Sequence, residues 1–179
     1  MSKRPALPEL PKSPLWWMLL NVFAFQLCWF SLVTIGNGAV PWVIAWLIGH
    51  WSLSPTANSD RYLMGVFAAI GLIAEGFHLY SGVLVLPERA GPVPPLWLIA
   101  FWPLFATLLN HSIRWLLVRP WLGAVLAAVG GWFSYFAGAK LAGGYLDPST
   151  SFIIAVEWAI LFYLSAIWLV PKSFQFTRQ

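Results

Sequence analysis

The chain has 179 residues, of which 60% are hydrophobic and only 9% are charged. Soluble domains carry about 25% charged residues, so this chain cannot cover a water-facing surface, and we predict a polytopic membrane protein. The net charge of +4 does not indicate a nucleic-acid partner, because the charges stand at the ends of apolar segments. Cys28 is the single cysteine, which excludes a disulfide framework.

Taken in chain order, residues 1–14 hold Lys3, Arg4, Lys12 and four prolines, and are expected to form a cytoplasmic tail. Six apolar stretches follow, separated by polar or Gly/Pro-rich segments, and each is expected to form a transmembrane helix. We therefore predict an all-α fold with one six-helix transmembrane domain over residues 15–170, and Pro171 is expected to open a second cytoplasmic tail, 171–179. The predicted helices cover residues 15–35, 39–53, 61–86, 96–118, 120–144 and 151–170.

The fifth stretch carries small residues every three or four positions, which places them on one stripe of a helix. Small residues let two helix backbones approach closely in lipid, where dispersion contacts stabilise the pair. We therefore predict that neighbouring helices pack on this stripe. Its members are Gly123, Ala127, Gly130, Ser134, Gly138 and Ala142.

The distribution of cations predicts the orientation, because cytoplasmic segments retain Lys and Arg. With both termini inside, only Arg89 and Lys140 fall on the outer side. The other eight cations fall on the inner side: Lys3, Arg4, Lys12, Arg61, Arg114, Arg119, Lys172 and Arg178. The sequence therefore predicts an N-in, C-in protein whose immediate partner is the lipid bilayer.

Ionisable residues inside the predicted third helix are the strongest functional signal. Glu75 and His78 are three residues apart, so their side chains are neighbours on one helix face. An ionisable residue at mid-bilayer costs at least about 2.5 kcal/mol and needs partners or water. A carboxylate beside an imidazole can exchange a proton with it, as general acid–base catalysis requires. We predict Glu75 and His78 as the catalytic pair; a structural hydrogen bond is the alternative.

Two further sets of polar residues are candidate binding residues. Lys140 and Glu157 lie in the outer half with the pair, and Tyr135 shares the fifth helix with Lys140. In the inner half, the fourth helix presents a second set, whose histidine and arginine could engage a lipid headgroup. Lys140 and Arg114 could instead extend to the interface. This set consists of Asn110, His111 and Arg114. A single Glu-x-x-His does not make a di-iron motif, which needs two copies, so no metal and no cofactor are predicted.

The segments PLWLIAFWPLFATLLNHSIRWL and GAVLAAVGGWFSYFAGAKLAGG resemble an uncharacterised bacterial inner-membrane family, domain of unknown function 2878. The resemblance spans residue 21 to about residue 163 and implies six helices, a multi-pass inner-membrane location and no established activity. Members are often encoded beside enzymes resembling cyclopropane fatty-acid synthases, which implies lipid chemistry and lipid-modifying partners. The chain has Glu75 where the family often has aspartate, and Trp132 where it often has proline.

Three hypotheses follow for the function. The first is a lipid-related membrane protein, either an enzyme or an accessory subunit, that uses Glu75 and His78 as an acid–base pair. The second is a small-molecule or proton-coupled transporter that uses the same residues as a relay. The third is a structural partner subunit. The sequence alone leaves enzyme, transporter and scaffold open, together with the oligomeric state.

Overall fold

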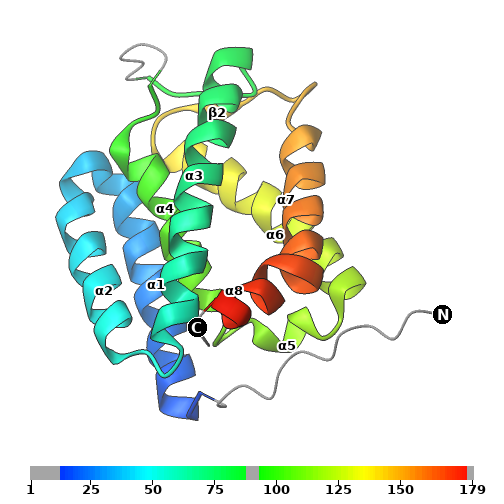
Figure 1. Cartoon of the computed structure of the whole chain (residues 1–179). Helices are drawn as coiled ribbons and strands as arrows, with labels where there is room; N and C mark the ends of the chain where they lie inside the picture. Colours follow the sequence, from blue (N-terminus) through cyan, green and yellow to red (C-terminus); the bar gives the residue numbers. More distant parts are fainter. Residues whose placement is uncertain (1–12, 88–92, 177–179) are drawn as a thin grey trace.

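The computed structural model describes residues 13–87 and 93–176, and these form a bundle of helices (Figure 1). Of the predicted tails, 1–14 and 171–179, residues 1–12 and 177–179 lie outside the described residues, as do the cations Lys3, Arg4, Lys12, Arg89 and Arg178. The longer helices are α1 (Leu15–Ile35), α2 (Val40–Leu53), α3 (Ala57–Ser81), α4 (Leu96–Leu109), α6 (Pro120–Leu141) and α7 (Phe152–Leu164). The short helices α5 (Arg114–Leu117) and α8 (Val170–Phe176) lie at the lower end of Figure 1.

The helices have the length and composition of membrane segments. Among the described residues, four helical segments are long and apolar enough to cross a membrane: Leu15–Leu53, Ala57–Ser81, Pro120–Leu141 and Phe152–Gln175. The first of these turns at the 3₁₀ segment η1 (Gly36–Ala39), where Gly36 has φ +63°, so it comprises both α1 and α2. The fold is therefore all-α and of membrane type, as the composition predicts.

Helix α3 starts and ends earlier than the predicted range of 61–86. It begins at Ala57, which brings Asp60 into its first turn, and Gly82 ends it with φ +78°. The following residues form β1 (Leu84–Val85), which pairs antiparallel with β2 (Tyr145–Leu146). This pairing requires glycine at position 144, because a Cβ there would lie 2.1 Å from the carbonyl oxygen of Val85.

The predicted fourth helix, 96–118, is interrupted in the structure. Helix α4 contains Pro103 without ending there, but it stops at Leu109, and the chain turns before α5 begins at Arg114. The turn is held by other helices: the Ser112 hydroxyl donates to the Met18 carbonyl at 2.9 Å and to Asn21 Oδ1 at 2.8 Å. Tertiary hydrogen bonds thus replace the helical ones at this point.

The last helix continues past Pro171, where the sequence predicts a tail. A π-helical turn, η2 (Ser165–Leu169), joins α7 to α8. Proline clashes with the carbonyl four residues earlier in an α-helix, and that carbonyl, of Ile167, lies within the wider π turn. The Ser165 hydroxyl donates to the Leu161 carbonyl at 2.7 Å across this turn.

Helix α6 packs against α7 through two glycines. A Cβ at Gly123 would lie 2.0 Å from the Phe162 ring, and one at Gly131 would lie 2.3 Å from the Trp158 ring. At Gly130, by contrast, a Cβ would have no described atom within 4 Å outside its own stretch of helix. The close approach therefore uses only part of the predicted stripe, and Gly131 replaces Gly130 in it.

Candidate functional site

The carboxylate of Glu75 is buried in the bundle and held by donors from two other helices. Glu75 Oε1 accepts a hydrogen bond from Trp102 Nε1 of α4 at 2.8 Å and another from the Tyr135 hydroxyl of α6. The Trp102 ring can approach α3 because position 71 is glycine; a Cβ there would lie 2.2 Å from the ring. The sequence-predicted residues Glu75 and Tyr135 are therefore in direct contact.

His78 links this carboxylate to a second one on α7. Its Nδ1 lies 3.4 Å from Glu75 Oε2, and its Nε2 lies 2.7 Å from Glu157 Oε2. Both Glu75 and His78 are fully buried. An imidazole between two carboxylates can take a proton from one side and pass one to the other. We name Glu75, His78, Glu157 and Tyr135 the carboxylate–histidine cluster.

The cluster reaches the protein surface at Glu157. The Glu157 side chain is 25% exposed, whereas the Glu75 and His78 side chains are fully buried. Glu157 lines an open groove of about 480 Å³ between α3 and α7. The rest of the groove is apolar: Ile70, Phe152, Ile153, Val156, Ile160, Leu161 and Leu164.

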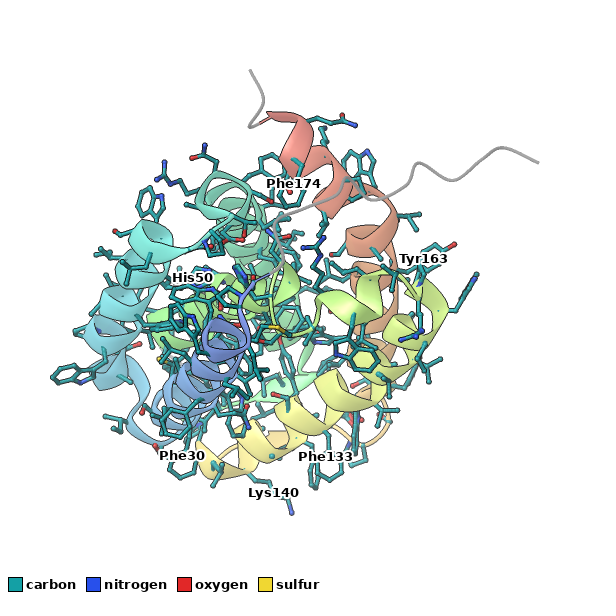
Figure 2. All side chains as sticks on the ribbon, turned by 90° about the horizontal axis from the view of Figure 1, so that it is seen from below. Phe30, His50, Phe133, Lys140, Tyr163 and Phe174 are labelled. Atoms are coloured by element: carbon teal, nitrogen blue, oxygen red, sulfur yellow. The ribbon has the colours of Figure 1, made fainter. Side chains whose placement is uncertain are left out.

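Lys140 does not join the carboxylate–histidine cluster. Its side chain is exposed, and its Nζ lies 5.0 Å from the centroid of the Phe136 ring on the same helix. Figure 2 shows Lys140 pointing outward from α6, away from the bundle. This position fits the alternative that the ammonium group extends toward the interface, and it does not support a shared site with Glu75.

The second predicted set is divided. Asn110 and His111 are buried and turn toward Asp60 of α3: Asn110 Nδ2 donates to Asp60 Oδ1 at 2.6 Å, and His111 Nε2 lies 3.1 Å from Asp60 Oδ2. Arg114 instead lies half-buried on α5. The predicted headgroup role of His111 is therefore not supported by its position inside the bundle.

Sequence reasoning missed most of this second cluster. His50 lies on the inner side of α2 (Figure 2), with Nε2 3.3 Å from Asp60 Oδ2. The hydroxyls of Ser54 and Thr56, in the α2–α3 turn, also hydrogen-bond to Asp60. The available signal was the polar stretch from Ser54 to Asp60, which lies between the predicted helices 39–53 and 61–86. We name His50, Ser54, Thr56, Asp60 and His111 the histidine–aspartate cluster.

An apolar layer separates the two clusters. Asp60 and Glu75 are fifteen residues apart on α3, which corresponds to about 22 Å along the helix axis. Between them, α3 turns Leu63 and Phe67 inward, and both are fully buried. The Phe67 ring packs against Phe105 with centroids 5.8 Å apart. The molecule therefore has two distinct polar sites.

An all-α bundle with apolar helices of membrane-spanning length and two buried clusters of ionisable side chains defines a membrane-type helical protein. A sequence model of the family described as "Protein of unknown function (DUF2878)" matches residues 18–164, and the chain belongs to this family. The resemblance noted from the sequence is thereby confirmed. No curated protein and no solved structure matches the chain.

Proposed function

We propose that this protein acts on a lipid inside the bacterial inner membrane, as a lipid-modifying enzyme or as an accessory subunit of one. The observation that carries the proposal is the position of Glu157. Its carboxylate forms part of an otherwise apolar groove on the outside of the bundle, and the same carboxylate binds the buried His78. A substrate could therefore reach an ionisable group from the bilayer without crossing water.

Each residue of the carboxylate–histidine cluster has a distinct role in this proposal. Glu157 meets the substrate and exchanges a proton with it. His78 exchanges that proton with Glu157 across the 2.7 Å contact. Glu75, fixed by Trp102 and Tyr135, lies 3.4 Å from His78 Nδ1 on the other side of the ring and orients the ring toward Glu157. General acid–base catalysis of this kind contributes about 10²–10⁴-fold to a rate.

The proposed orientation has six spans with both termini in the cytoplasm. Five described residues are lysine or arginine, and four of these lie at the end of the bundle that carries α5 and α8 (Figure 1): Arg61, Arg114, Arg119 and Lys172. Lys140, the fifth, lies near the other end. This asymmetry supports a cytoplasmic lower end by the positive-inside rule. The carboxylate–histidine cluster then belongs to the outer half of the membrane.

A proton-coupled transporter is the second candidate, and the apolar layer at Phe67 and Leu63 counts against it. A relay across the membrane would have to connect Glu75 with Asp60 through these fully buried side chains. Two separate polar sites are more consistent with chemistry that is local to each site than with one continuous proton path across the membrane.

Comparative lipid analysis of a deletion strain tests the proposed class of function. We expect the deletion to change the acyl-chain or headgroup composition of the membrane, and the intact gene to restore it. An unchanged lipid composition, together with solute or proton flux in liposomes that contain the purified protein, would support the transporter instead. If the lipid composition is unchanged and no flux is observed, the result supports the structural-subunit hypothesis.

A further inference from the structure

The histidine–aspartate cluster lies apart from the carboxylate–histidine cluster, and the proposed lipid chemistry does not use it. His50, Asp60 and His111 come from α2, α3 and the turn after α4, and their side chains are fully buried. One ligand atom of each residue lies within 4.8 Å of those of the other two. Three elements far apart in sequence thus bring two imidazoles and a carboxylate together.

Too many polar groups converge on one oxygen atom. Asp60 Oδ2 lies 3.3 Å from His50 Nε2, 3.1 Å from His111 Nε2 and 3.2 Å from the Thr56 hydroxyl, and it accepts a hydrogen bond from Ser54. A carboxylate oxygen has two lone pairs, so it cannot accept hydrogen bonds from all four of these groups. A cation among these groups would use both imidazole nitrogens as electron-pair donors instead.

The bonding of His50 points to a ligand. Although Nε2 is at ion-pair distance from Asp60, neither ring nitrogen of His50 makes a hydrogen bond to any residue that the structure describes. Buried polar atoms are almost always paired, and an unpaired one costs about 1–3 kcal/mol. Aromatic rings hold the imidazole in place: Trp17 stacks on it at a centroid distance of 5.5 Å, and Trp46 lies at 5.8 Å.

We propose that His50, Asp60 and His111 bind a divalent transition-metal ion, with zinc or ferrous iron as the candidates. A tetrahedral ion with bonds of about 2.0–2.1 Å separates its ligand atoms by about 3.3 Å. The separations of 3.3 and 3.1 Å from Asp60 Oδ2 to the two imidazole nitrogens match this spacing. Two histidines and one carboxylate are the ligands of both catalytic zinc sites and non-haem iron sites.

The surroundings supply the outer contacts that metal ligands need. Ser13 Oγ lies 2.5 Å from His111 Nδ1, which fixes the ring with Nε2 toward Asp60. Asn110 donates to Asp60 Oδ1 at 2.6 Å and orients the carboxylate. Such partners fix the orientation of metal ligands, and their loss weakens metal binding by about 10–100-fold.

A surface groove adjoins the histidine–aspartate cluster. A groove of about 340 Å³ lies over the α2–α3 turn, and the cluster residues Ser54 and Thr56 belong to its lining. Three protein ligands leave at least one coordination position open, which is typical of catalytic rather than structural metal sites. Ser54 and Thr56 hydrogen-bond to Asp60 and also line the groove, so their hydroxyls could hydrogen-bond to a water molecule that a bound metal would hold.

Metal analysis of the purified full-length protein tests the proposal. The detergent-solubilised protein is stripped with a chelator, reloaded separately with Zn²⁺ and with Fe²⁺ under anaerobic conditions, and desalted. We expect one ion per chain with one of these metals, and loss of that ion in His50→Gln, Asp60→Asn and His111→Gln. The matched control is His78→Gln, at the remaining histidine of the chain, which should keep the metal.

A second measurement keeps the test valid if the three variants fail to fold. Wild-type protein loaded with Co²⁺ should give the visible absorption of a four- or five-coordinate ion, and Ser13→Ala, a milder change, should weaken metal binding by about 10–100-fold. Wild-type protein that retains none of the three metals would overturn the proposal. So would equal metal loss in His78→Gln.

Discussion

The buried carboxylate of Glu75 shows how much a single residue requires of its surroundings. An unpaired charge in the bilayer is costly, and three side chains offset this cost: the Trp102 indole, the Tyr135 hydroxyl and the His78 ring. One of these donors depends on close packing, since Trp102 lies directly over Gly71. The stability of the bundle and the state of the proposed site are therefore coupled.

Removing one donor should make this coupling visible. Tyr135→Phe deletes only the hydroxyl that bonds to Glu75, and we expect the protein to lose about 1–3 kcal/mol of stability because a buried acceptor loses its partner. The measurement is thermal unfolding in detergent. The matched control is Tyr80→Phe, on the exposed face of the same bundle, which should be neutral. Equal unfolding temperatures for the two variants would contradict the assigned hydrogen bond.

Lys140 should be dispensable for the proposed chemistry. Its exposed ammonium group lies over Phe136, outside the carboxylate–histidine cluster. We expect Lys140→Gln to restore a normal lipid composition in the deletion strain at a normal protein level. Failure of Lys140→Gln to restore it would indicate that Lys140 belongs to the site, as the sequence predicts.

The residues of the site could be predicted from the sequence where helical spacing determines contact. Glu75 and His78 are neighbours on any helix, and their approach to Glu157 follows from a similar depth. The position of Lys140 on the outside could not be predicted, because it depends on how α6 is rotated. Asp60 was missed because the start of α3 at Ala57, rather than at residue 61, is what carries it into the bundle.

At the scale of the helices, adjacent glycines of α6 should respond differently to substitution. Gly131→Ala places a methyl group against the Trp158 ring, and overpacking of this kind costs about 1–3 kcal/mol. Gly130→Ala points into open space beside an apolar cavity of about 490 Å³ and should be neutral or slightly stabilising.

Thermal unfolding of both variants in detergent measures this difference. If Gly130→Ala were the more destabilising change, the assigned packing of α6 on α7 would be wrong. The sequence places the small residues on this helix. Their spacing of three or four residues does not show which of the glycines faces a bulky ring.

The other differences between the predicted and the observed helices also depend on contacts between helices. The sequence predicts the starts of α1, α4 and α6 because each follows a proline or a change from polar to apolar residues. It does not predict the break after Leu109. There, the side chains of Ser112 and His111 contact other helices, and the helical hydrogen bonds of α4 do not continue. Nor does it predict that the π turn carries the last helix through Pro171.

The orientation of the whole molecule can be tested with a reporter fused after Gln179. Because the cations gather at the end that carries α5 and α8, we expect both termini to lie in the cytoplasm. A fluorescent reporter should therefore be active there, and a phosphatase that folds only in the periplasm should not. The reverse pattern would invert the proposed orientation and move the carboxylate–histidine cluster to the inner half.

For the molecule as a whole, the central claim is that the carboxylate–histidine cluster carries out chemistry on a lipid. The most direct measurement is the lipid composition of the deletion strain that expresses Glu75→Gln, or Glu75→Gln with His78→Asn, at the wild-type protein level. Glu75→Gln keeps the shape of the side chain, and both changes remove a titrating group. We expect strains that express either variant to have the same lipid composition as the deletion strain without the gene. A wild-type lipid composition from the double variant would contradict it.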